Sequence, residues 1–262
     1  MTQTPRKPRR LVAARRALTV GTLAAGLATA AHAAVLTPAE ADLPDSYWLA
    51  AGDGEEEGEG EATEARLDDD AFLVALGRLE GQLRAATALA GEGDAKGAAA
   101  LLDRSEDATL AALDARGTDV TEALDALGTA LREGHAQAQY DTARDLFETA
   151  RRETTARAQF RSLITLTREA GKTYGNAVDG TKITDLAAYR AAWGMIQLAK
   201  TEAGELAKAG NDRIARAGQG LLDALAFAAP AFTDLQGDGL QPDASLLHGA
   251  AGRMELALSK VY

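Results

Sequence analysis

From residue 71 onward, apolar side chains recur every three or four positions, and this spacing limits the fold more than any other feature of the chain. Phe72, Leu76, Leu79 and Leu83 form one such stripe, and others begin near residues 120 and 160. A period of three to four residues places these side chains on one face of an α-helix. Runs of β-branched residues, which favour strands, are few. The pattern predicts an all-α domain over residues 71–262, with no β-strand.

Capping and turn residues divide this domain into helices. Gly91-Glu92-Gly93 is expected to end a helix, Asp119 with Glu122 suits a capping box, and Asp179-Gly180 suits a turn. Further helices are expected at about 95–115, 136–153, 184–208, 211–228 and 244–260. Abundant alanine permits close packing, so we predict an antiparallel helical bundle of about seven or eight helices. A helical-repeat solenoid is the alternative architecture.

The first 33 residues have the three parts of a secretory signal peptide. Six Lys and Arg side chains, with no acidic one, precede an apolar stretch over 17–30 that ends in Ala31-His32-Ala33. This stretch is shorter than the ~20 residues of a membrane-spanning helix. We therefore predict cleavage at the small residues Ala31 and Ala33, a periplasmic or secreted protein, and no transmembrane segment after cleavage. An uncleaved anchor is the alternative. Arg15-Arg16 also suits the twin-arginine route, so the export route stays open.

Cleavage would leave 22 basic against 39 acidic side chains, a net charge of −17. About half of that charge lies between residues 53 and 70, where glycine separates clustered acidic residues. A segment with this composition buries too little apolar surface to order itself, so residues 34–70 are predicted to be a flexible acidic linker. A weak store of cations is the alternative role. The negative charge argues against nucleic acid as a partner, because phosphates would be repelled.

The chain lacks the residue patterns of common catalytic sites. It contains no cysteine, which excludes thiol catalysis and disulfides, and no nucleophile-elbow, Walker or dinucleotide-binding motif occurs. After cleavage two histidines remain, His135 and His248, and neither has the spacing of a helical metal site. His135 follows Gly134 at a predicted helix end, where a surface position suits it better than a role as metal ligand. We predict that the protein is not an enzyme.

Aromatic and acidic side chains gather where two helices are predicted to meet, around the turn at residues 179–180. Tyr189 and Trp193 are four residues apart and so share a helix face. The favoured interpretation is an aromatic anchor that fixes the helix pair. In the functional alternative, the segment lines a polar cleft. The weakest version of this alternative is an enzyme that uses carboxylates in the cleft for catalysis. The candidate cleft residues are Glu169, Tyr174, Asp179, Tyr189 and Trp193.

The same segment resembles a known group of proteins. Tyr174, Val178-Asp179-Gly180, Ile183 and the run from Tyr189 to Trp193-Gly194 are similar to a family of exported α-helical proteins of proteobacteria. Upstream, Gly81-Gln82-Leu83-Arg84, the run from Ala100 to Leu113, and Ala115-Arg116-Gly117 extend the likeness over about residues 70–205. It is also similar to the helical periplasmic extensions of some iron permeases and, more distantly, to imelysin-like metal-associated proteins.

The resemblance implies a metal-linked role with an altered site. Relatives carry histidine where this chain has Gln82, Leu101 and Arg104, and imidazole is a good ligand for iron, copper and zinc. Leucine and arginine cannot replace it. Glu106 and Asp107 remain, and with His135 they are weak candidate metal ligands. At most a weakly bound divalent cation or iron is expected as cofactor.

Two functions are therefore predicted from the sequence. The first is an exported, non-enzymatic helical binding or accessory protein linked to metal uptake, with a periplasmic partner such as a metal transporter. The alternative is a structural or protein-interaction component of the periplasm or cell envelope.

Overall fold

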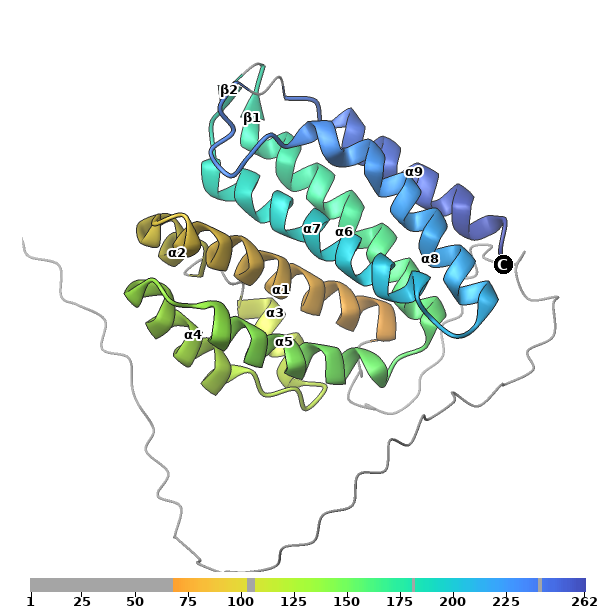
Figure 1. Ribbon diagram of the computed structural model, residues 1–262, viewed down its shortest axis with the longest axis horizontal. Helices are drawn as coiled ribbons and strands as arrows, with labels where there is room; N and C mark the ends of the chain where they lie inside the picture. Colours follow the sequence, from red (N-terminus) through yellow and green to blue (C-terminus); the bar gives the residue numbers. More distant parts are fainter. Residues whose placement is uncertain (1–67, 103–106, 181, 240–241) are drawn as a thin grey trace, which may run out of the picture. The chain divides into compact units, whose positions relative to one another are not determined.

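The computed structural model describes residues 68–102, 107–180, 182–239 and 242–262, which form a bundle of helices (Figure 1). The predicted signal peptide and residues 34–67 of the predicted linker lie outside the described residues. In the described part, nine α-helices and a short 3-10 helix account for most of the chain, so the predicted all-α bundle is confirmed. No helix in these ranges combines the length and apolar character needed to cross a membrane.

The helices are more numerous and shorter than expected. The stretch predicted as one helix over 95–115 is described as two, with residues 103–106 between them outside the described ranges. The first five helices are α1 (Asp69–Gly91), α2 (Ala95–Leu102), α3 (Asp107–Asp114), α4 (Thr121–Glu133) and α5 (Gln137–Arg152). The last four are α6 (Ala156–Ala177), α7 (Leu186–Ala207), α8 (Asp212–Leu225) and α9 (Ser245–Ser259), with the 3-10 helix η1 (Ala226–Ala231) after α8.

A small hairpin corrects the expectation that no strand would occur. Strands β1 (Val178–Asp179) and β2 (Lys182–Ile183) pair antiparallel between α6 and α7. Gly180 has a φ of +59°, a conformation that favours glycine, so the chain reverses at the predicted turn. Because the reversal is so tight, the two residues on each side are drawn into hydrogen-bonded pairing.

The last three residues of the predicted linker belong to the bundle instead. Asp68 is the N-cap of α1, and its side chain accepts a hydrogen bond from the Ala71 amide at 2.7 Å. Asp69 and Asp70, in the first turn of α1, form ion pairs with Arg116 and Arg161. Carboxylates stabilise a helix N-terminus, where amide groups lack partners. Asp68, Asp69 and Asp70 therefore belong to the cap and first turn of α1, so the predicted boundary at residue 71 falls inside this helix.

Helices α1 and α7 join two apolar cores. One core lies mainly among α6, α7, α8 and α9, and the other mainly among α1, α2, α4 and α5. The two helices touch at Gly81 and Gly194, where a Cβ atom on Gly194 would lie 1.9 Å from the Gly81 carbonyl oxygen. Only glycine permits this approach, so both residues fix the distance between the two halves of the bundle.

Candidate functional site

Tyr174 and Tyr189, both predicted cleft residues, form an aromatic cluster in the core. They are fully buried on α6 and α7 and pack with Phe232, with ring centres 5.3 to 5.8 Å apart. The Tyr189 hydroxyl donates a hydrogen bond to the Asp234 carbonyl at 2.9 Å. Burial raises the pKa of Tyr189 to about 12, so its proton is retained at neutral pH. These contacts hold α6, α7 and the segment after η1 together, as an aromatic anchor does.

The other three predicted cleft residues lie in different surroundings. Asp179 is exposed on the hairpin, whereas Trp193 is half-buried and packs against the core around α1. Tyr189 and Trp193 therefore contribute to different cores, because α7 is buried on both of its sides. Glu169 lines a surface pocket that contains none of the other four. The five residues do not form a single cleft.

Of the three candidate metal ligands, the structure describes the side chain of His135 alone. Glu106 lies outside the described residues; Asp107 begins α3, and its side chain is outside them as well. His135 is exposed directly after Gly134, the left-handed C-cap of α4, and its Nε2 atom lies 3.2 Å from a Glu133 carboxylate oxygen. Within the described ranges, no group of three or more His, Asp or Glu side chains is arranged to hold a metal ion.

A polar pocket between α1, α3, α6 and α7 is the candidate binding site. Its volume is about 350 Å³, within the range of small-molecule sites. Its base is formed by the buried apolar side chains of Leu79, Ala188, Ala191 and Met195. Its rim is formed by the polar side chains of Arg78, Gln82, Glu169, Lys172 and Thr173, and the buried residue Thr109 also lines the pocket. An apolar base with a polar rim can hold a small molecule and orient it.

An ion pair between α1 and α6 fixes one wall of this polar pocket. The Arg78 guanidinium donates to both carboxylate oxygens of Glu169, each at 2.5 Å. This two-pronged geometry is the strongest form of an arginine–carboxylate pair. The contact between Gly81 and Gly194 sets the separation of α1 and α7 one turn further along, so that Met195 reaches the base.

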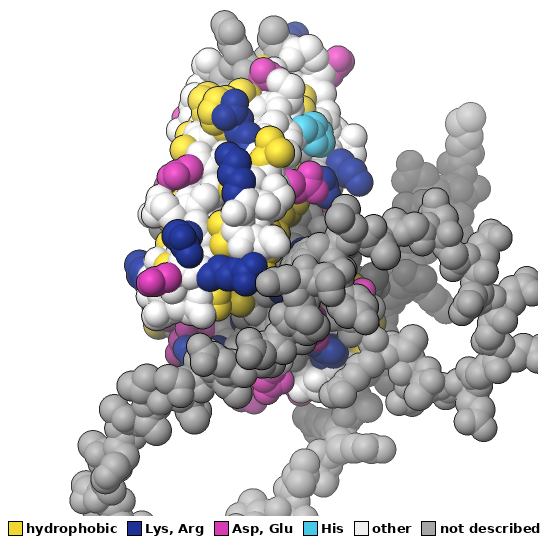
Figure 2. Space-filling view, turned by 90° about the vertical axis from the view of Figure 1, so that its right-hand side faces the viewer, with side chains coloured by type: hydrophobic (Ala, Val, Ile, Leu, Met, Phe, Trp, Pro, Cys, Tyr) yellow, Lys and Arg dark blue, Asp and Glu magenta, His cyan; other side chains and the backbone are white. Residues whose placement is uncertain are grey.

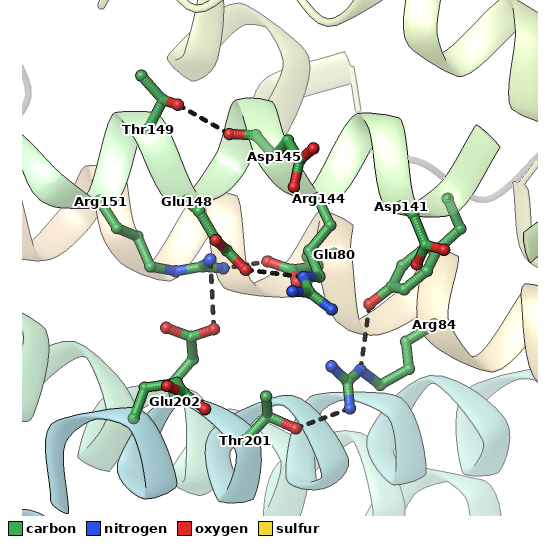
Figure 3. Close-up of polar contacts among 12 residues, drawn as sticks. Glu80, Arg84, Asp141, Arg144, Asp145, Glu148, Thr149, Arg151, Thr201 and Glu202 are labelled. Carbon is green, nitrogen blue, oxygen red and sulfur yellow. Dashed lines mark hydrogen bonds and ion pairs between the residues drawn. The ribbon is translucent and has the colours of Figure 1, made fainter. Parts of the chain in front are cut away.

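A second polar cluster lies buried between α1, α5 and α7 (Figure 3). Arg151 of α5 donates a hydrogen bond to Glu80 of α1, and its other terminal nitrogen lies 3.4 Å from a carboxylate oxygen of Glu202 on α7. Glu80 is fully buried, and the Arg151 side chain is only 10% exposed. Nearby, Arg84 donates to the Tyr140 hydroxyl at 3.2 Å and to the Thr201 hydroxyl at 2.8 Å. This cluster ties three helices together by polar contacts.

Burial and neighbouring charges shift the pKa values in this cluster. Burial lowers the pKa of Arg151, but the carboxylates of Glu80 and Glu202 outweigh it, so the net pKa is raised and the guanidinium stays charged. Burial raises the pKa of Glu202, against the opposing effect of Arg151. Burial also raises the pKa of Tyr140. The cluster is closely packed and lacks a cavity for a ligand beyond a water-sized space beside Arg151 and Glu202, so we interpret it as a structural clamp.

Arg78 and Thr109 are pocket residues that sequence reasoning missed. Glu169, Lys172 and Thr173 have the i, i+3, i+4 spacing of one helix face, and Arg78 and Gln82 have the same i, i+4 spacing on another helix. These spacings were a usable signal for two polar faces. Which helix faces which depends on packing, and no local pattern contains that information.

Comparisons with known proteins found no match for this chain. No family model matches the chain, and neither a curated protein nor a solved structure matches it.

Proposed function

We propose that this chain is an exported, non-enzymatic helical binding or accessory protein, and that the polar pocket between α1, α3, α6 and α7 is its ligand site. The observation that carries the proposal is the combination of an apolar base and a polar rim in a pocket of about 350 Å³. Small-molecule sites combine apolar surface with polar groups that select the ligand, and this pocket has four apolar and six polar lining side chains.

A plugged pocket tests this role. Thr173 is half-buried at the rim, so Thr173→Trp should occupy the pocket, whereas Thr165→Trp places the same side chain at an exposed position of α6 two turns earlier. A library of small anionic, neutral and cationic metabolites is screened against the full chain by thermal unfolding. We expect at least one compound to stabilise the wild type and Thr165→Trp but not Thr173→Trp. If every stabilising compound acts equally on both variants, or none stabilises the wild type, the pocket is not the ligand site.

We also propose that the chain is linked to metal uptake and that its metal site is degenerate. Its support is the resemblance to metal-associated exported proteins, in which Gln82 stands where relatives have histidine. Among the described lining residues of the pocket, the one carboxylate, that of Glu169, is already paired with Arg78. Calorimetric titration with iron, copper, zinc and manganese compares the full chain with a deletion of residues 53–67, which spares the α1 N-cap. Stoichiometric micromolar binding that survives the deletion supports the metal role. Weak, salt-sensitive uptake that disappears with the deletion excludes it.

A surface between α8 and α9 favours the second candidate function, a protein-interaction component. Phe227 and Leu256 are 46% and 62% exposed there, and Arg253 lies over the Phe227 ring at 3.4 Å from its centre. Figure 2 shows Lys and Arg side chains among hydrophobic ones on this side of the bundle. Leu256→Glu should abolish capture of a periplasmic partner, while Leu146→Glu, at an exposed leucine of α5, should not. Equal capture by both variants would exclude this surface.

Export is tested at the N-terminus of the protein recovered from the cell envelope. We expect the mature chain to begin after Ala33, at the predicted cleavage site. Recovery of the intact N-terminus from membranes would favour the uncleaved anchor instead.

A further inference from the structure

The described lining residues of the polar pocket carry more positive than negative charge. Arg78 and Lys172 are the cations among them, and Glu169 is the carboxylate. Both Glu169 oxygens already accept hydrogen bonds from Arg78, whereas Lys172 is exposed and forms no ion pair with any residue in the described ranges. Among these residues, the ammonium group of Lys172 is therefore the charge that remains for a negatively charged ligand.

Unengaged hydrogen-bond donors lie beside this ammonium group. Thr109 is only 5% exposed and lines the pocket, yet its side chain has no hydrogen-bond partner in the part of the chain that the structure describes. The same holds, within those ranges, for the Gln82 amide and the Thr173 hydroxyl. Because these groups line the pocket, each of them can donate a hydrogen bond to a ligand there. These three groups come from three different helices and line one pocket.

The base of the pocket adds an apolar requirement. Leu79 and Met195 are 1% and 5% exposed, and Ala188 and Ala191 are each 8% exposed. Ala188 and Ala191 have small side chains, and an apolar part of a ligand can contact them in the pocket. An inorganic anion would leave this apolar surface uncovered.

We propose that the polar pocket binds a small organic carboxylate with an apolar body, held by Lys172 and by the hydroxyl groups of Thr109 and Thr173. This inference rests on the proposed binding function and specifies its ligand class. A volume of about 350 Å³ is at the lower end of small-molecule sites, so the ligand is a compact one of benzoate size. The Arg78–Glu169 pair remains intact and serves as a wall.

Four probes separate the components of this inference. Benzoate has both the charge and the apolar body, benzamide is its neutral counterpart, benzylamine reverses the charge, and inorganic phosphate lacks the apolar body. Calorimetry on the full chain should show benzoate binding at least tenfold more tightly than benzamide, because a charge-assisted hydrogen bond is about twice as strong as a neutral one. Benzylamine and phosphate should bind more weakly still.

Variants at Lys172 test the contact directly. Lys172→Met should weaken benzoate binding at least tenfold and leave benzamide binding unchanged, and Lys172→Arg should restore most of the affinity because it keeps the charge. Lys172 is exposed, so these variants should fold as the wild type does. Lys208→Met is the control, since Lys208 lies at the far end of α7 and pairs with Glu205.

Three results would overturn the inference. The first is benzamide or benzylamine binding as tightly as benzoate, and the second is a Lys172→Met variant that keeps benzoate affinity. The third is an absence of benzoate binding at millimolar concentration. In each case the binding function itself stands if another compound is lost in Thr173→Trp and retained in Thr165→Trp, and it fails only if none is.

Discussion

Replacing Arg151 with methionine would remove the guanidinium that lies between two carboxylates at the contact of α1, α5 and α7. Glu80, its partner on α1, is fully buried, and Glu202 on α7 lies 3.4 Å from its other terminal nitrogen. Methionine fills most of the space of the arginine stem but carries no charge. The variant therefore tests one interaction, the neutralisation of a carboxylate that water cannot reach.

The burial of Glu80 sets the expected magnitude. Removing one partner of a buried ion pair costs about 3 to 5 kcal/mol, because the remaining charge is left without compensation. For a domain of this size, each kcal/mol lowers the melting temperature by about 2 to 4 °C, so the expected decrease is about 6 to 20 °C. Arg152→Met is the matched control. Its side chain is 76% exposed and pairs with Glu148 at 3.4 Å, so it should cost about 0.5 kcal/mol or less.

A double variant separates lost charge compensation from lost packing. Glu80→Leu with Arg151→Met removes the charges of the closer pair and leaves Glu202, which is less buried than Glu80. It should recover part of the stability, because a buried pair replaced by apolar side chains is often neutral or stabilising. The single variant should also depend on pH. A carboxyl group buried without its cation has a raised pKa, so the folded state takes up a proton and the stability loss should shrink from pH 7 to pH 5.

Urea unfolding followed by circular dichroism measures all four proteins. The reasoning is refuted if Arg151→Met loses less than about 1 kcal/mol, which is the range of an exposed pair. It is also refuted if the double variant is no more stable than Arg151→Met, because the cost would then come from packing rather than from an uncompensated charge.

Three further predictions concern other contacts of the bundle. Burial raises the pKa of Glu202 above 4.5. The stability tied to its protonated form is therefore complete below that pH and is lost as the pH rises through the raised value. In urea unfolding, the stability of Glu202→Gln relative to the wild type should increase from pH 4 to pH 7, and a constant difference would contradict this. Tyr189→Phe should cost about 0.5 to 1.5 kcal/mol by thermal unfolding through loss of its 2.9 Å hydrogen bond, whereas Tyr174→Phe, whose hydroxyl forms no hydrogen bond of normal geometry with a described residue, should cost less. Gly194→Ala should destabilise the protein by about 1 to 3 kcal/mol or more, because the added carbon meets a backbone oxygen. Gly204→Ala is its control and should be neutral or stabilising, since Gly204 has open space around it. Equal melting temperatures for these two variants would exclude the close helix contact.

The class of fold and the ends of several helices followed from local sequence. The apolar period from residue 71 onward predicted helices, and Gly91-Glu92-Gly93 and Gly134 end α1 and α4 as their backbone conformations require. Such features depend on residues a few positions apart, which is why sequence alone contains them. The predicted boundary at residue 71 falls inside the first turn of α1, because a run of aspartates suits both an acidic linker and a helix N-terminus.

The candidate site was decided by tertiary structure. Glu169 was singled out from the sequence, but its partner Arg78 is 91 residues away, and the aromatic residues expected beside it pack into a separate cluster. Which faces of α1, α6 and α7 meet depends on the close contact of Gly81 with Gly194 and on how two apolar cores fill their volume. That the chain forms amphipathic helices follows from the spacing of neighbouring residues, because that property is local. Which polar side chains share a pocket depends on contacts between residues far apart in the chain, and these contacts form when the helices pack.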